Sequence, residues 1–193
     1  PYSCEARFRR ADGEYRWLLN TGRPLDSNRF VGSSADISER KRARRNLDLA
    51  VAVAQVVIWE VDFLNDRLLF DETQLPILGV NFDRSNSRIA AWIERIHAAD
   101  RAEFEARVRR ASAPDGEVFD YEYRMAGRDG TEQWIHSLGR VVQRTADGAP
   151  VFAVGTSMNV TVSKRNALEL EQHRHRLEEL VAQRTAELMA TEA

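Results

Sequence analysis

The sequence predicts an α+β fold, in which a five-stranded antiparallel sheet carries short helices on one face and is flanked by N- and C-terminal helices of the coiled-coil type. Three observations predict this fold. Apolar and polar residues alternate over several short segments, Asp-Gly turns join some of these segments, and one block of sequence occurs twice. Alternation is typical of half-buried strands, and Asp-Gly is typical of hairpins because Gly adopts a positive φ at little cost.

The composition is that of a folded chain without an obvious membrane segment. Its 193 residues suffice for one domain with additions or for two small domains. Apolar residues make up 43% and charged residues 30%, and no apolar run is long enough to cross a bilayer. The net charge of −2 gives no reason to expect nucleic acid as a partner, and the basic run at 40–45 is interpreted as a solvated helix face. We therefore expect a cytoplasmic chain with neither a nucleic-acid nor a membrane partner.

The cysteine count fits a cytoplasmic chain, and the first residues of the sequence indicate a fragment. The single cysteine, Cys4, can form no internal disulfide and no cysteine-based metal site, and we expect no metal. The first residues already follow a strand pattern and include no start methionine. We expect the chain to be a fragment of a longer protein.

An internal repeat gives the chain one and a half copies of one unit. Residues 5–23 align with 122–140 at an offset of 117, and the match resumes after a six-residue insertion. The identical pairs are Glu5 and Glu122, Arg7 and Arg124, Asp12 and Asp129, Gly13 and Gly130, Trp17 and Trp134, Gly22 and Gly139, Arg23 and Arg140, Val31 and Val154, Gly32 and Gly155, Ser34 and Ser157, and Lys41 and Lys164. The first copy retains only its last three strands.

The elements follow from local patterns in chain order. They are three strands within 5–38, a helix at 39–55, a hairpin of 56–63 and 67–70, short helices at 71–79, 87–97 and 101–111, and three strands within 119–160. Asp71 and Asp100 are the expected N-caps of two short helices, and Gly79 ends the first of them. Pro76 limits that helix, because proline lacks the backbone N–H.

The last three strands are expected to present one apolar face each. Phe119, Tyr121, Tyr123 and Met125 alternate with polar residues on the first of them, and Phe152, Val154, Thr156 and Met158 share a face on the third. A long helix without Gly or Pro follows at 162–193. Its narrow apolar stripe has near-heptad spacing and predicts a parallel coiled coil in a homodimer, with the seam residues Leu170, Leu177, Val181 and Leu188.

These segments resemble the PAS sensor domains of bacterial sensor kinases. The resemblance is carried by "IWEVDF", "ILGV", "WIERIHAADR", "EYRMAGRDGTEQWIHSLGR" and "VGTSMNVTVSKR", and "DISERKRA" at 36–43 resembles the signature that ends such domains. It implies four parts: the last three strands of an incomplete first PAS domain at 1–38, a linking helix at 39–55, a complete PAS domain at 56–161 and an output coiled-coil helix at 162–193. The second copy departs from the signature, because Asn159 replaces its Asp and Val162 its Glu.

The resemblance implies that each strand-to-helix junction passes input to output. The junction residues are Asp36, Ile37 and Ser38 in the first copy, and Asn159, Val160 and Thr161 in the second. Ser38 and Thr161 are expected to act as N-caps, since a side-chain oxygen there can accept from N–H groups of the first turn. Ordinary capping without a signalling role is the alternative.

The resemblance also implies a space for a small ligand between helices and sheet, although plain core packing would use the same residues. Candidate lining residues are Trp59, Phe70, Trp92, Tyr121, Tyr123, His136 and Phe152. The cofactor, if the core holds one, is left open. A flavin adduct of cysteine is excluded because residues 5–193 contain no cysteine, and haem is disfavoured because His97 belongs to a helix-entry motif and His136 is the other histidine of the complete copy.

The expected function is that of a sensory and signal-relay PAS region in a bacterial signal-transduction protein, with a sensor histidine kinase as the expected parent. The fragment itself is not expected to be an enzyme, because no catalytic constellation and no glycine-rich nucleotide loop occur in it. Its expected partners are a second copy through the flanking helices and a downstream kinase or other output domain of the same chain. The alternatives are a dimerisation scaffold that binds no ligand, and the input module of a diguanylate cyclase or phosphodiesterase.

Overall fold

The computed structural model describes residues 1–71, 73–80 and 87–191, with side chains described up to residue 185. The chain divides into two compact units, Pro1–Ala54 and Gln55–Ala193. Each unit contains one antiparallel sheet. The units are described in turn.

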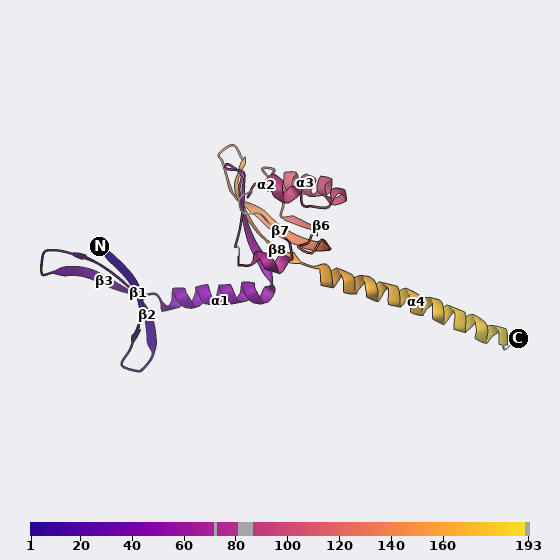
Figure 1. Cartoon of the computed structure of the whole chain (residues 1–193), viewed down its shortest axis with the longest axis horizontal. Coiled ribbons are helices and arrows are strands. Elements are labelled where there is room, and N and C mark those ends of the chain that lie inside the picture. The colour runs from indigo at the N-terminus through magenta and orange to yellow at the C-terminus, as the bar shows by residue number, and fades with distance from the viewer. Residues whose placement is uncertain (72, 81–86, 192–193) are drawn as a thin grey trace. The chain divides into compact units, whose positions relative to one another are not determined.

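The first unit is a three-stranded sheet followed by a helix (Figure 1). Strands β1 (Tyr2–Arg9), β2 (Tyr15–Pro24) and β3 (Phe30–Asp36) pair in this order, and helix α1 (Ser38–Ala54) begins two residues after β3. The β1–β2 turn uses Gly13 at φ +89°, while Asp12 Oδ1 accepts a hydrogen bond from the N–H of Glu14. The three strands expected within 5–38 are therefore present.

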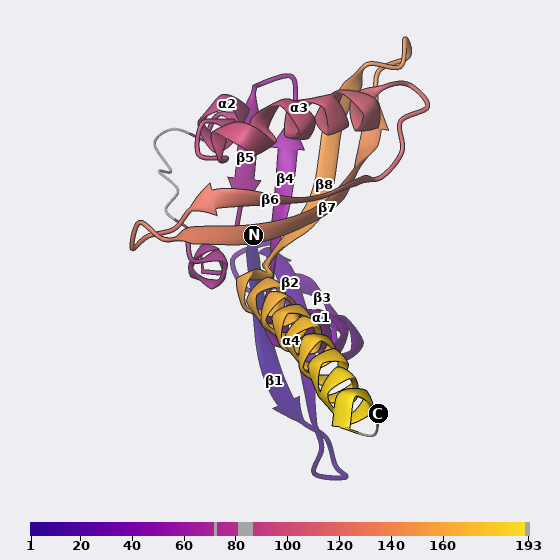
Figure 2. The ribbon, with the colours of Figure 1, turned by 90° about the vertical axis from the view of Figure 1, so that its right-hand side faces the viewer.

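The second unit contains the expected five-stranded antiparallel sheet, in the order β5-β4-β8-β7-β6 (Figure 2). Its strands are β4 (Val56–Asp62), β5 (Arg67–Phe70), β6 (Phe119–Ala126), β7 (Glu132–Arg144) and β8 (Pro150–Asn159). The first and last strands of this unit, β4 and β8, lie side by side at its centre. The strand that leads into the C-terminal helix is therefore held on both sides, by β4 and β7.

Short helices cover one face of this sheet and enclose the core. They are the 3₁₀ helix η1 (Leu75–Leu78) and the α-helices α2 (Ile89–Ile93) and α3 (Ala98–Ser112). The buried core combines residues of the helices with alternate residues of the strands, including Val57, Leu68, Leu78, Trp92, Phe104, Tyr123 and Ile135. Alternation places every second residue of a strand on the covered face.

The short helices differ from the sequence-based expectation in length and in capping. The 71–79 segment is helical over Leu75–Leu78, and Asp71 accepts from the N–H of Thr73 instead of capping that helix. The 87–97 segment is helical over Ile89–Ile93, since Ile96 pairs with strand β6 at Met125.

Helix α3 begins earlier than expected and has a different cap. It starts at Ala98, and its N-cap is His97, whose Nδ1 accepts from the N–H of Ala99 over 3.3 Å. Asp100, the expected cap, lies in the first turn and binds Arg124 instead. The strand bonds that shorten α2 also fix this start, because the N–H of His97 donates to the carbonyl of Arg124.

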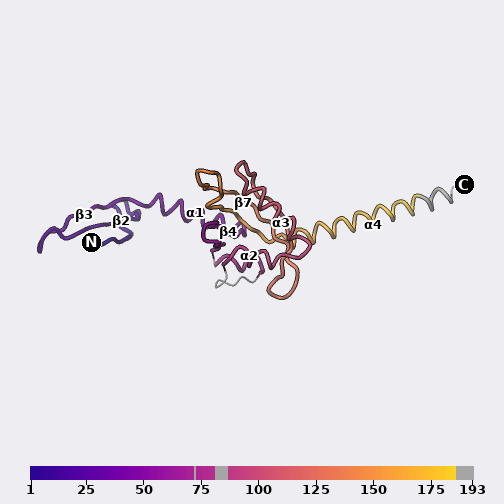
Figure 3. Tube along the Cα trace, turned by 90° about the horizontal axis from the view of Figure 1, so that it is seen from above, coloured from indigo at the N-terminus to yellow at the C-terminus, as the bar shows by residue number. Residues whose placement is uncertain are grey.

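The complete sheet is followed by a long helix, α4 (Thr161–Thr191), whose coloured part runs without a break in Figure 3. The expected C-terminal helix is thus present. The chain itself begins with a strand and not with a helix, and the helix before the complete domain is α1, which lies between the two sheets in sequence. Within the described residues, no helix is long and apolar enough to cross a membrane.

Candidate functional site

The junction between β8 and α4 is fixed by hydrogen bonds to both main-chain groups of Trp134 on β7. The N–H of Val160 donates to the carbonyl of Trp134 over 2.8 Å, and the N–H of Trp134 donates to Oγ1 of Thr161 over 2.8 Å. Helix α4 then starts with the bond from the N–H of Lys164 to the carbonyl of Val160. The first residues of α4 are therefore tied to strand β7, the neighbour of β8 in the sheet.

Asn159 connects this junction to the short helix η1. Its Oδ1 accepts from the N–H of Thr161 over 2.9 Å, and its Nδ2 donates to the carbonyl of Leu78 over 2.8 Å and to Oε1 of Gln133 over 2.9 Å. Gln133 Oε1 also accepts from the hydroxyl of Thr161 over 3.1 Å. One amide thus joins the end of β8, the start of α4, β7 and η1, and we call Leu78, Gln133, Asn159 and Thr161 the junction clasp.

A cation of the first turn of α4 adds a second attachment to the sheet. Lys164 forms an ion pair with Glu122 of β6, and its ammonium lies 5.2 Å from the centre of the Trp134 ring. The guanidinium of Arg124 lies over the same ring at 5.5 Å. These residues are identities of the internal repeat, so the repeat marks the residues that fasten the helix.

The first unit builds the same junction from the equivalent residues. Ile37 donates to the carbonyl of Trp17 over 2.8 Å, and the N–H of Trp17 donates to Oγ of Ser38 over 2.8 Å. Lys41 pairs with Glu5 at 2.5 Å, and its ammonium lies 4.9 Å from the Trp17 ring centre. The fastening is therefore a property of the repeated unit.

The two junctions differ where the charge differs. In the first, the N–H of Ser38 donates to Asp36 Oδ1 over 2.8 Å, and Arg16 lies 3.5 Å from Asp36 Oδ2. Hydrogen bonds from Ser38, with the positive charge of Arg16, lower the pKa of Asp36. The repeat places Gln133 at the position of Arg16 and Asn159 at that of Asp36, so a neutral amide pair replaces an ion pair.

The hydroxyls of Ser38 and Thr161 do not have the expected capping partner. Each accepts from a tryptophan N–H of the neighbouring strand, and the side chain two residues before it accepts from the helix start instead. The expected cap residues, Ser38 and Thr161, therefore bind the neighbouring strand, while Asp36 and Asn159 bind the start of the helix. Gln133 and Leu78 were not among the candidates, because no local pattern connects residues 26 and 81 positions away from Asn159.

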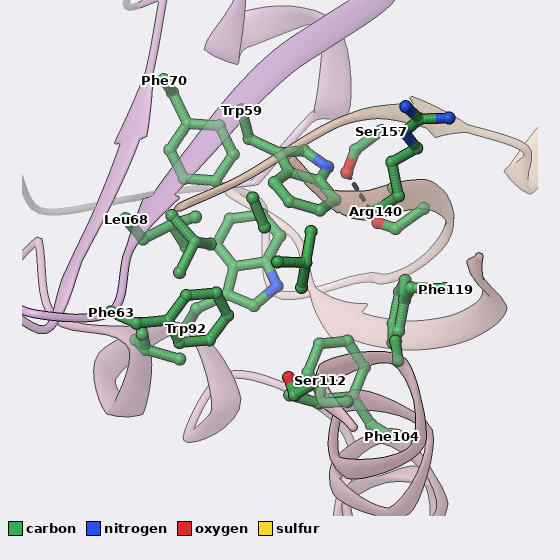
Figure 4. Close-up of a pocket in the computed structure, with 18 of the residues that line it drawn as sticks. Trp59, Phe63, Leu68, Phe70, Trp92, Phe104, Ser112, Phe119, Arg140 and Ser157 are labelled. Atoms are coloured by element: carbon green, nitrogen blue, oxygen red, sulfur yellow. Dashed lines mark hydrogen bonds between the residues drawn. The ribbon is translucent and has the colours of Figure 1, made fainter. Parts of the chain in front are cut away.

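A cavity of about 90 Å³ lies between the covered face of the sheet and helices α2 and α3 (Figure 4). Of the seven candidate lining residues, four line it: Trp59, Phe70, Trp92 and Tyr123. The remaining wall is formed by residues that include Phe63, Leu68, Phe104, Phe119, Ser137, Gly139, Ala153 and Ser157. In Figure 4, Phe104 and Phe119 face Trp92 and Trp59 across this space.

The other three candidates lie outside the cavity. Tyr121 stacks on Tyr123 at 6.0 Å beneath the guanidinium of Arg107. His136 and Phe152 point to the opposite face of the sheet, because their neighbours Ser137 and Ala153 face the cavity. His136 Nε2 lies 2.8 Å from Asp120 Oδ1.

The prediction that Phe152 lines the cavity was wrong, because the positions of β8 that face the cavity carry small residues. Trp59 lies flat against Gly139 and Gly155, and a Cβ atom at either glycine would overlap its ring. The ring of Trp59 thus occupies the space that side chains at Gly139 on β7 and Gly155 on β8 would need. A pattern that follows large apolar residues leads to the opposite face.

A chain of hydrogen bonds crosses the cavity wall. Trp92 Nε1 donates to the hydroxyl of Tyr123 over 3.1 Å, this hydroxyl lies 2.9 Å from Ser137 Oγ, and Ser137 Oγ lies 2.6 Å from Ser157 Oγ. Burial raises the pKa of Tyr123 to about 12, so the phenol is protonated at neutral pH. We call Tyr123, Ser137 and Ser157 the hydroxyl wall.

The expected seam of α4 lies on an exposed helix. Leu170, Leu177 and Val181 are 71%, 61% and 63% exposed, while the side chain of Leu188 lies outside the described residues. The coiled coil stays a prediction. No cluster of side chains suited to a metal ion occurs among the described residues.

The second unit is an α+β domain built on a five-stranded antiparallel sheet, and comparison with known proteins identifies this fold. Residues 67–157 match the family described as the PAS fold, and this part of the chain is a PAS domain. It is similar to the PAS domains of sensor histidine kinases.

Two relatives illustrate this similarity. The chain is 31% identical over 199 residues to the two-component sensor PprA of Pseudomonas aeruginosa. The aligned region covers 93% of this chain and 21% of that protein. The chain thus spans about a fifth of that relative. A crystal structure of a sensory box histidine kinase/response regulator from Burkholderia thailandensis matches with a TM-score of 0.56 and 28% identity, over 69% of this chain and 98% of that one.

Proposed function

We propose that this chain is a signal-relay PAS region of a bacterial sensor histidine kinase. In this role, a change in the core of the complete domain alters the junction clasp and thereby the start of α4. The altered helix then changes the packing of a dimeric output helix, which biases a kinase farther along the same protein. The parent class is supported by the two relatives above, whose names describe a two-component sensor and a histidine kinase.

One observation carries the relay: Asn159 bonds the core helix η1 and the output helix α4 with the same amide group. Leu78, whose carbonyl accepts from Asn159, is itself fully buried in the core cluster together with Trp92 and Tyr123. A displacement of η1 by a change in the core therefore strains or breaks the bond to Asn159. The same amide orients Thr161, so the strain reaches the first turn of α4.

Asn159→Asp tests this relay in the sensor protein that contains this chain together with its output domain. The carboxylate retains an acceptor for the N–H of Thr161 but loses the donor to the carbonyl of Leu78. We expect the variant to fold and to lose most of its stimulus-dependent change in kinase autophosphorylation.

A second variant separates folding from relay. Gln133→Arg/Asn159→Asp recreates the ion pair of the first junction, where Arg16 and Asp36 stand at these positions. It should recover stability without recovering regulation, because the bond to Leu78 is still absent. Gln143→Glu is the control, because it makes the same amide-to-carboxylate change at an exposed residue without a side-chain hydrogen bond among the described residues. Regulation that survives in both Asn159 variants would show that the relay does not use this amide.

The dimeric output helix is supported by the exposed apolar positions of α4. A helix with a narrow apolar stripe cannot bury that stripe alone, and a second copy covers it symmetrically. The scaffold alternative shares this dimer but predicts no effect of core changes on α4. The Asn159 variants therefore also distinguish a relay from a scaffold.

A further inference from the structure

Trp92 and the hydroxyl wall together carry one more donor proton than the hydrogen bonds among them use. Trp92 Nε1, Tyr123, Ser137 and Ser157 carry one donor proton each, and three contacts join the four groups. Ser157 also acts to lower the pKa of Tyr123, but the hydrogen-bond contacts of the phenol among the described residues are with Trp92 and Ser137. One hydroxyl proton of the chain is thus left for an acceptor outside it.

The direction of the chain places this proton on Ser157. Trp92 can only donate, so the phenol accepts from it, while in the other two contacts either hydroxyl can be the donor. In the arrangement in which each bond polarises the next, Tyr123 donates to Ser137 and Ser137 donates to Ser157, so the unused proton is that of Ser157. Ser157 lines the cavity, and Figure 4 shows its oxygen at the wall with the bond to the neighbouring hydroxyl.

We propose that the cavity binds a small, uncharged and largely apolar molecule with one acceptor oxygen, such as a short ketone, and that Ser157 donates to this oxygen. The inference rests on the sensor role proposed above and names the class of ligand. The apolar body fits a wall built mainly from Trp59, Phe63, Leu68, Phe70 and Phe104. The acceptor satisfies a buried donor that would otherwise cost free energy to leave unpaired.

The size of the cavity restricts the ligand further. Its volume of about 90 Å³ is well below the ~150 Å³ of an engineered apolar cavity that binds benzene. A molecule of about five non-hydrogen atoms is the appropriate size, and such a small ligand is expected to bind at about millimolar concentration. A flavin or haem would require the core to open.

The experiment compares two molecules of one shape. 2-Butanone carries the acceptor oxygen, and 2-methyl-1-butene has a CH₂ group in its place. Both are titrated into the whole chain and followed by NMR on the indole N–H signals of its four tryptophans. We expect 2-butanone to bind about two- to tenfold more tightly, the factor for one net hydrogen bond, and to shift the Trp92 signal through the hydroxyl chain.

Variants of one residue locate the donor. Ser157→Ala should reduce the preference for the ketone towards one, and Ser157→Thr, which keeps the hydroxyl, should retain it. Ser112→Ala is the matched control, because Ser112 lines the same cavity away from the hydroxyl wall. Ser137→Ala, which interrupts the chain before Ser157, should remove the shift of the Trp92 signal if Ser157→Ala fails to fold.

Two results would overturn the inference: equal affinity for the two molecules, as when a water molecule holds the free proton, or no binding of either at the limit of solubility. The relay can fail separately. A ketone preference together with unchanged regulation in the Asn159 variants leaves the ligand site standing without the relay. Equal affinity for the two molecules together with lost regulation in the Asn159 variants leaves the relay standing without this ligand.

Discussion

Asn159 donates from its side-chain amide to the main-chain carbonyl of Leu78 over 2.8 Å, although the two residues lie 81 positions apart. The same amide accepts from the N–H of Thr161, at the start of α4. Among the described residues, Leu78 is the one member of the junction clasp without a counterpart in the first unit, because that unit has no helix equivalent to η1. The Asn in place of Asp is thereby explained, since a carboxylate has no hydrogen to donate to a carbonyl.

Asn159→Ala should lower the free energy of unfolding of the second unit by about 1–3 kcal/mol, because it leaves buried groups at Leu78 and Thr161 without their partner. Urea denaturation of the whole chain, followed by tryptophan fluorescence, measures the change. Gln143→Ala is the control, since Gln143 is exposed and has no side-chain hydrogen bond among the described residues; it should alter stability by less than about 0.5 kcal/mol. Equal effects of the two substitutions would contradict the role of the clasp.

The strands could be predicted from the sequence because their signals are local. Asp12-Gly13 and Asp129-Gly130 predict turns, and both glycines have the positive φ that these turns require, +89° and +79°. The helices were less predictable, because the backbone after Ile93 is used by strand β6 at Met125 and not by the helix. That competition depends on a contact across the fold.

The site was predicted in part for the same reason. The resemblance singled out Asn159 and Thr161, which stand opposite Asp36 and Ser38 in the internal repeat. Gln133 and Leu78 carry no signal of their own, since their roles arise only where β7 and η1 meet the junction. On the cavity side, the large aromatic residues were recognisable, but the hydroxyl wall uses Ser137 and Ser157, whose small size hides them from an apolar pattern.

Gly155→Ala should destabilise the second unit by about 1–3 kcal/mol, the usual cost of overpacking. The added methyl group would overlap the ring of Trp59, which lies directly across from Gly155 in the β4–β8 register, and also the main-chain carbonyl of Leu138. A double-mutant cycle with Trp59→Leu isolates the effect of the ring, because the smaller side chain removes the overlap with the ring while the overlap with the carbonyl of Leu138 remains. Thermal unfolding of the wild type, the two single variants and the double variant measures the coupling between the two changes. Strict additivity of the two changes would show that the ring does not set the requirement for glycine.

Asp100→Asn should reduce stability at pH 7 by about 1.5–3 kcal/mol, the range for hydrogen bonds to a charged group. Asp100 accepts from Nε of Arg124 over 2.8 Å and from Nη2 over 2.6 Å, and its carboxylate is largely buried. These bonds, together with the N–H of Arg124 and its charge, lower the pKa of Asp100 in the folded chain.

The same pair gives stability a defined pH dependence. Because the folded pKa of Asp100 is below the unfolded value of about 3.9, its contribution is fully present above that value and is lost as the pH falls through the folded pKa. Urea midpoints measured from pH 6 to pH 3 should fall less steeply in Asp100→Asn than in the wild type. Asp115→Asn, an exposed site with no ion pair among the described residues, should leave the slope unchanged. Parallel curves for the wild type and Asp100→Asn would contradict the assignment.

Leu177→Asp should weaken the proposed dimer at least tenfold, because it places a charge in the apolar seam of α4. With Leu170 and Leu177 seven residues apart and Val181 four residues later, the seam follows the d, d and a positions of a heptad. Leu168→Asp is the matched control: Leu168 is 60% exposed on the same helix but lies outside that seam. Sedimentation equilibrium over a range of concentrations distinguishes the two. A wild-type chain that remains monomeric, or an equal loss in both variants, would show that the exposed stripe is not a parallel seam, and the output model would then need another source of dimerisation.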